Sequence, residues 1–185
     1  GVFGANRLGS TSLSEGPIFG ARAGRAAAAL SEATDEVSQE IKKKVFATHL
    51  SRYDSLLGQS GDKAGSHLIK DLQQAAWNGI GPARTEKGIK NFLQQTANFR
   101  CDAEKISISD ETLWNQSLID YLEFINMLDT ADAIAISALE RENSLGAHIR
   151  LDGGVTSVLF GKPYSISIYH NKDTNFEVDR LSRPS

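Results

Sequence analysis

The stretch that decides the fold stands near the start of the chain: Gly-Ala-Asn-Arg-Leu-Gly-Ser-Thr-Ser-Leu at residues 4–13, followed by Phe-Gly-Ala-Arg-Ala-Gly at residues 19–24. Its first half is a polar turn with one cation, Arg7, and its second half supplies hydroxyl side chains that can cap a helix. The residues that follow are mostly glycine and alanine, which allow close packing of a helix backbone against a neighbour. We therefore expect a small-faced, buried helix from Ser12 to about residue 29.

The beginning of such a helix is a suitable place for an anionic group. Free backbone N–H groups and the positive end of the helix dipole favour a phosphate, a carboxylate or a reduced flavin there. Arg7, just upstream, carries a planar guanidinium that can bind a carboxylate at two points. From spacing alone, a surface or structural ion pair is the simpler explanation of Arg7.

The order of residues in this stretch closely resembles the last flavin-contacting segment of the succinate dehydrogenase and fumarate reductase flavoprotein subunits. L-aspartate oxidase belongs to the same superfamily and has a similar segment. In that family the arginine of the motif binds a substrate carboxylate, and the Ser-Leu pair that opens the helix lies against the flavin. The resemblance therefore implies that Arg7 binds substrate and that Ser12 and Leu13 bind FAD. It implies no catalytic acid or base in this chain.

Two residues of the motif depart from the family pattern. Phe3 stands where the family usually has histidine, so the substrate pocket loses a polar, titratable neighbour. Thr11 stands where asparagine is usual, which is a milder change because a hydroxyl acceptor remains.

Composition limits the other possibilities. The chain has 185 residues, 40% of them hydrophobic, and a formal net charge of −3, which gives no support for a nucleic-acid partner. Cys101 is the single cysteine, so an intrachain disulfide is impossible and a reducing compartment is expected. The histidines are scattered without metal-ligand spacing, so we expect no metal site. No apolar run approaches the roughly 18 residues that a membrane helix needs.

In the family, the glycine-rich dinucleotide-binding loop, the covalent flavin-attachment histidine and the proton-donating arginine all precede the motif at residues 4–13. We find no glycine-rich loop of that type after a predicted strand. We therefore expect this chain to begin in mid-domain and to share its FAD with a partner chain or a missing N-terminal half.

The chain is predicted to be mainly α and to have three parts. Residues 1–57 form the C-terminal segment of the FAD-binding domain, in which a second, amphipathic helix runs from about residue 35 to 56. Residues 66–150 form a helical domain. Residues 151–185 form a β-rich tail, because residues 156–160 and 164–169 alternate with period two and read as a hairpin.

Within the helical domain we predict helices at residues 67–77, 85–99 and 112–143. Thr85 caps the second, and Asp110 and Glu111 form an acidic cap before the third. The third has a continuous apolar stripe, which predicts its core face. The stripe consists of Leu118, Leu122, Ile125, Leu128, Ala131, Ala135, Ala138 and Leu139.

Three further segments, residues 80–89, 123–128 and 141–150, also match the family, and we assign structural roles to Arg84 and His148. For His148 we expect a hydrogen bond to the backbone at a helix end. Leu145 and Leu151 replace an arginine and an acid of the family pattern. This segment lies between the helical and flavin domains in the family, so the replacements suggest an altered ion pair that affects packing.

The resemblance implies a succinate:quinone type of electron transfer, with hydride exchange between a dicarboxylate and FAD. It also implies an N-terminal flavoprotein half, an iron–sulfur subunit and, indirectly, membrane anchor subunits as partners. The location would be peripheral, on the matrix side of the mitochondrial inner membrane or the cytoplasmic face of a bacterial membrane.

An L-aspartate oxidase-like fragment and a non-catalytic scaffold are the alternative functions. The strand-like tail favours the first family, since L-aspartate oxidases usually end sooner. Reaction direction, electron acceptor and covalent attachment of FAD stay open.

Overall fold

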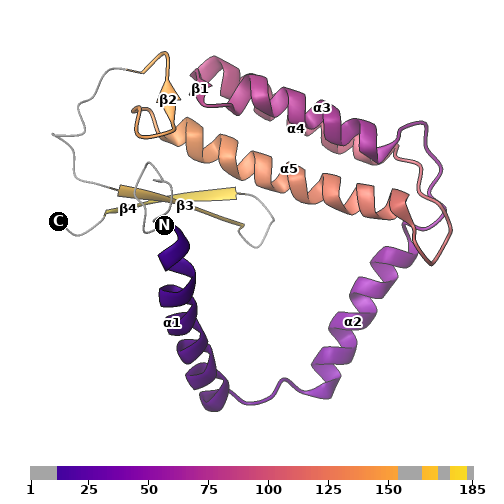
Figure 1. The fold of residues 1–185 in the computed structure, drawn as a ribbon. Helices are drawn as coiled ribbons and strands as arrows, with labels where there is room; N and C mark the ends of the chain where they lie inside the picture. Colours follow the sequence, from indigo (N-terminus) through magenta and orange to yellow (C-terminus); the bar gives the residue numbers. More distant parts are fainter. Residues whose placement is uncertain (1–11, 154–163, 171–175, 183–185) are drawn as a thin grey trace. The chain divides into compact units, whose positions relative to one another are not determined.

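The computed structural model describes residues 12–153, 164–170 and 176–182 (Figure 1). The chain divides into two compact units, Gly1–Ser55 and Leu56–Ser185, which are described separately. Arg7 and the rest of residues 1–11 lie outside the described residues, as does the predicted strand at residues 156–160.

The first unit contains helices α1 (Ser12–Ala33) and α2 (Gln39–Asp54). The predicted start of α1 at Ser12 is confirmed. The side chain of Ser38 caps α2 by accepting a hydrogen bond from the backbone N–H of Ile41 at 3.3 Å. This cap supplies an acceptor for a backbone N–H group that has no partner within the helix.

Within the described part of the first unit α1 is not buried, contrary to our expectation. A Cβ built on Gly16, Gly20 or Gly24 would meet no heavy atom within 4 Å, so the small face of the helix is open. The apolar stripe of α2 is exposed as well, with Phe46 67% and Leu50 45% exposed. Glycine and alanine side chains are small and offer little apolar surface. A partner surface that covers this face of α1 must therefore approach the helix backbone closely.

The second unit is built around a three-helix core made of α3 (Gly65–Ile80), α4 (Glu86–Ala103) and α5 (Gln116–Glu140), which lie side by side in Figure 1. Phe124 is fully buried and meets Phe99 edge to face, with ring centroids 6.1 Å apart. The predicted stripe of α5 is confirmed at its buried members, Leu128, Ala131, Ala135 and Ala138. Phe124 was missing from that stripe, although it is one of the largest fully buried side chains.

The helix caps of this unit confirm one prediction and correct another. The hydroxyl of Thr85 accepts a hydrogen bond from the N–H of Gly88 at 3.0 Å, as expected for an N-cap. The predicted cap at Asp110 and Glu111 is wrong, because α5 begins later and Asn115 caps it. The amide oxygen of Asn115 accepts from the N–H of Leu118 at 2.9 Å. Its amide group also donates to two loop carbonyls, so one buried asparagine fixes both the loop and the helix start.

Two short sheets complete the unit. Strand β1 (Ala83–Arg84) pairs in parallel with β2 (Ile149–Arg150), which ties the end of α3 to the segment after α5. Strand β3 (Tyr164–His170) pairs antiparallel with β4 (Phe176–Ser182), with Ile168 opposite Val178. The described hairpin is therefore formed by β3 and the strand that follows it. Among the described helices, none is long and apolar enough to span a membrane.

Candidate functional site

The structure describes only part of the predicted FAD and substrate site. Arg7 lies outside the described residues. Ser12 is the first residue of α1, and Leu13 follows it with 80% of its surface exposed. Glu15 is an acidic residue in the same first turn.

The first turn of α1 has features that fit the electron-rich edge of a flavin. The first N–H groups of an α-helix have no intrahelical acceptor, and the helix dipole adds partial positive charge at this end. The exposed side chain of Leu13 adds apolar surface that a flat ring could cover. Glu15 already places one negative charge in this turn, so the fit depends on that side chain pointing away from the ring. Within the described ranges, no cluster of histidine, cysteine, aspartate or glutamate could hold a metal ion.

A second set of polar side chains lies where α3 ends and β1 and β2 pair, and Arg84 is its first member. Arg84 Nε donates to the carbonyl oxygens of Ile80 at 3.1 Å and Gly81 at 2.6 Å, and Nη1 lies 2.8 Å from His148 Nδ1. Arg84 therefore satisfies carbonyls that the end of α3 would leave without partners. This confirms the structural role expected for Arg84.

His148 joins this set to the end of α5. Its Nε2 lies 2.9 Å from the carbonyl oxygen of Arg141, which confirms the predicted backbone hydrogen bond. Burial lowers the pKa of His148 below its ordinary value of 6.5, and the charges of Arg84, Arg150 and Arg141 lower it further. The backbone hydrogen bond to Arg141 acts in the opposite direction. The ring is thus held in place at a helix end rather than presented for proton transfer.

Arg150 is a buried charged residue of this region, since only 7% of its surface is exposed. Its Nε donates to Asp152 Oδ1 at 2.9 Å, and its Nη1 donates to the carbonyl oxygen of Arg141 at 3.1 Å. Asp152 also accepts from the N–H of Glu86 at the start of α4. The Arg150–Asp152 pair is the ion pair of this segment, while the side chain of Leu151 is 68% exposed. We did not predict this pair, although residues two apart on an extended segment point to the same side.

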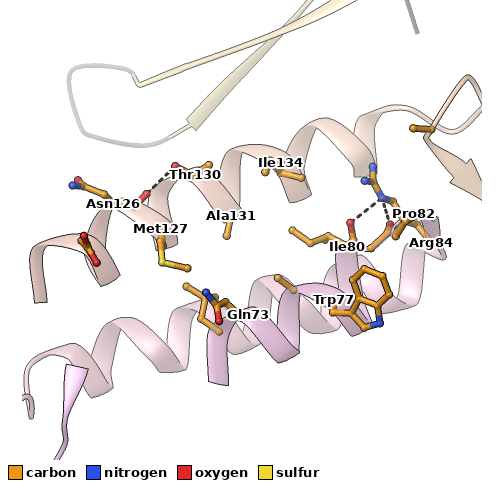
Figure 2. A pocket seen from close by; sticks show the side chains of 15 residues that line it. Gln73, Trp77, Ile80, Pro82, Arg84, Asn126, Met127, Thr130, Ala131 and Ile134 are labelled. Atoms are coloured by element: carbon orange, nitrogen blue, oxygen red, sulfur yellow. Dashed lines mark hydrogen bonds between the residues drawn. The ribbon is translucent and has the colours of Figure 1, made fainter. Parts of the chain in front are cut away.

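An open groove of about 810 Å³ runs between α3 and α5 and was also not predicted. Figure 2 shows Trp77 and Arg84 at one end of the groove, and Asn126 and Met127 at the other. Apolar side chains, among them Leu72, Ile80 and Ile134, supply most of its walls. Sequence periodicity assigns residues to a helix face but does not say which part of an apolar face stays uncovered.

Comparisons with known proteins show the family to which this chain belongs. Residues 69–176 match the family described as fumarate reductase flavoprotein C-term. The chain is 33% identical over 155 residues to the succinate dehydrogenase flavoprotein subunit of Rickettsia bellii, covering 82% of this chain and 25% of that protein. It is 31% identical over 153 residues to the fumarate reductase flavoprotein subunit of Haemophilus influenzae, covering 82% and 26%. The chain thus spans about a quarter of the length of these relatives.

Solved structures agree with the sequence relatives. The fold matches a FrdA mutant from the quinol fumarate reductase of E. coli, with a TM-score of 0.85, 25% identity, and coverage of 96% of this chain and 31% of that one. The Sdh1 complex of Mycobacterium smegmatis shares the fold, with a TM-score of 0.81 at 22% identity, covering 97% of this chain and 31% of that one. The chain belongs to the C-terminal family of the succinate dehydrogenase and fumarate reductase flavoprotein subunits.

Proposed function

We propose that this chain supplies the C-terminal part of a flavoprotein that transfers hydride between succinate or fumarate and FAD. The family match across residues 69–176 carries this proposal. The preserved order of residues 4–13 supports it, because that stretch holds the residue types needed for a dicarboxylate and for a flavin edge. The rest of the FAD site would come from sequence outside this chain, since the chain spans only a quarter of its relatives.

Each proposed site residue has a distinct task. Arg7 binds one carboxylate of the dicarboxylate through two parallel hydrogen bonds and so fixes its orientation. Ser12 and the N–H groups of the first turn of α1 stabilise negative charge at the adjacent ring edge. Leu13 covers the ring and excludes water from it. FAD, when bound, would supply the group that accepts or donates the hydride.

We infer the partners from the same family membership. One solved structure of similar fold is a quinol-fumarate reductase with menaquinol molecules. For this chain we propose an N-terminal flavoprotein half, an iron–sulfur subunit and, through it, membrane anchor subunits. The proposed location is the surface of a mitochondrial inner membrane, on the matrix side, or of a bacterial cytoplasmic membrane.

A comparison of two arginine variants tests the proposed role of Arg7 in binding substrate. Arg7→Ala in the assembled flavoprotein should lower succinate oxidation by at least about 100-fold, because an oriented substrate contributes a large part of the rate. Flavin content should stay unchanged, because Arg7 contacts substrate rather than the ring. Arg25→Ala is the matched control, since Arg25 is an exposed arginine of α1 that lies about three helical turns after Leu13 and outside residues 4–13. Near-normal turnover in the Arg7→Ala variant would remove Arg7 from the substrate site.

A further inference from the structure

The groove between α3 and α5 ends at a cation that has no carboxylate partner among the described residues. Arg84 hydrogen-bonds to two backbone carbonyls and one imidazole, all of which are uncharged acceptors. Arg100 and Arg150 differ, because Arg100 pairs with Asp132 and Arg150 pairs with Asp152. The third partly buried arginine, Arg141, places its guanidinium over the ring of Tyr164. Burial lowers the pKa of Arg84, and no charge of opposite sign offsets it. A half-buried guanidinium of this kind favours an incoming carboxylate.

Among the described residues of the second unit, the walls of the groove next to this cation are apolar and exposed. Trp77 is 70% exposed and Ile134 is 44% exposed, and both line the groove. In Figure 2, Trp77 lies at the same end as Arg84. Large exposed apolar side chains grouped beside a charge are typical of binding surfaces rather than of free surface.

The length of the groove indicates the kind of occupant. On α5 its lining runs from Glu123 to Ile134, which is about 16 Å at the helical rise per residue. This length corresponds to about three turns of a helix or about five residues of a strand. A small carboxylate would fill only the Arg84 end and leave the Met127 end open. The groove therefore fits a polypeptide segment better than a small anion.

We infer that this groove docks an apolar polypeptide segment that carries one aspartate or glutamate opposite Arg84. The segment belongs to the part of the flavoprotein that this chain does not span, so the inference rests on the proposed function. Its other end carries no acidic residue, because Glu123 lines the groove there. Docking pairs the charge of Arg84 and buries the indole of Trp77.

Tryptophan fluorescence follows this docking directly, because the chain has two tryptophans, Trp77 and Trp114. The Trp114→Phe variant leaves Trp77 as the single reporter of this chain. In the separate chain its emission should be that of a solvated indole and should be quenched by acrylamide. In the full flavoprotein, with tryptophans outside this chain replaced by phenylalanine, the emission should shift to the blue and quenching should fall several-fold. Equal quenching in both states would overturn the inference.

A pair of isoleucine variants tests the groove without touching Arg84, whose loss could disturb the end of α3. Ile134→Glu places a carboxylate inside the groove and should weaken assembly with the remainder of the flavoprotein by at least about tenfold. Ile119→Glu is the matched control, because Ile119 is 45% exposed on the same helix and does not line the groove. Both separate chains should unfold at similar denaturant concentrations. Equal assembly constants for the two variants would contradict the docking site.

A small-molecule titration distinguishes the alternative occupant. Excess succinate or butyrate added to the separate Trp114→Phe chain should leave Trp77 quenching unchanged. Protection by either compound would assign the groove to a small carboxylate and overturn the inference. The proposed function is tested separately by succinate-dependent flavin reduction, which can succeed when Trp77 stays exposed and can fail when Trp77 is buried.

Discussion

Arg84 fixes the protonation state of His148 through a hydrogen bond of 2.8 Å between Nη1 and Nδ1. A guanidinium can only donate, so His148 Nδ1 must accept and cannot carry a proton. The carbonyl oxygen of Arg141 can only accept, so Nε2 of the same ring must carry the proton. The folded state therefore requires neutral His148 in its Nε2–H form.

The first prediction concerns the pH dependence of stability. His148 has a folded-state pKa below its unfolded value near 6.5, so the unfolded chain takes up a proton first as the pH falls. The stabilisation is complete above about pH 6.5 and is lost as the pH falls toward the lower folded-state pKa. Urea denaturation of the chain at about pH 7.5 and about pH 5.5 should show a lower free energy of unfolding at the acid value.

His148→Gln is the control for this pH effect. The glutamine amide has an acceptor oxygen for Arg84 and an N–H donor for the carbonyl of Arg141, and it does not titrate. The variant keeps every other titratable group of the chain, so the difference in pH dependence between the two proteins isolates His148. An identical loss of stability in both proteins would show that His148 is not the titrating group.

The second prediction concerns the core. Phe124→Ala should lower the free energy of unfolding of the helical unit by about 3–5 kcal/mol, because it removes a fully buried ring and its contact with Phe99. Leu113→Ala is the contrast, since Leu113 is 75% exposed and should change stability by less than about 0.5 kcal/mol. Denaturant titrations of both variants measure the difference. Similar values for the two would contradict the assigned core.

The third prediction concerns Asp132, which joins α5 to α4. Its carboxylate accepts from Thr96 Oγ1 at 2.6 Å and from Arg100 Nη2 at 2.6 Å. Asp132→Ala should cost about 1–2 kcal/mol of unfolding free energy, because Thr96 and Arg100 each keep one other acceptor.

The exposed pair of Lys90 and Glu86 provides a comparison for Asp132. Lys90→Ala should change stability by less than about 0.5 kcal/mol, because both partners are solvated. Thermal or denaturant unfolding of Asp132→Ala and Lys90→Ala measures which variant loses more stability. A larger effect for Lys90→Ala would contradict the assignment of Asp132 as the stronger link.

The sequence predicted the helices and most of the core face well, for physical reasons. Leu128, Ala131, Ala135 and Ala138 recur at helical spacing, and all four are buried. The start of α5 was predicted wrongly because an acidic pair is a common cap, whereas Asn115 caps the helix with one hydrogen bond and holds two loop carbonyls with its amide group. Such tertiary contacts leave no periodic signal.

The candidate site was only partly predictable. The structural roles of Arg84 and His148 were expected, but the Arg150–Asp152 pair and the groove beside Trp77 depend on which segments meet in space. The burial of α1 was expected from its small residues, yet among the described residues of the first unit Gly16, Gly20 and Gly24 face open space. Arg7, Ser12 and Leu13 stay predictions.

The most direct measurement is the visible absorption spectrum of the purified native assembly that contains this chain, before and after adding succinate without oxygen. The account predicts a flavin band that succinate bleaches and fumarate restores, with L-aspartate as a substrate control that leaves the band unchanged. A complete assembly without a flavin band, or with a band that succinate does not bleach, would contradict it.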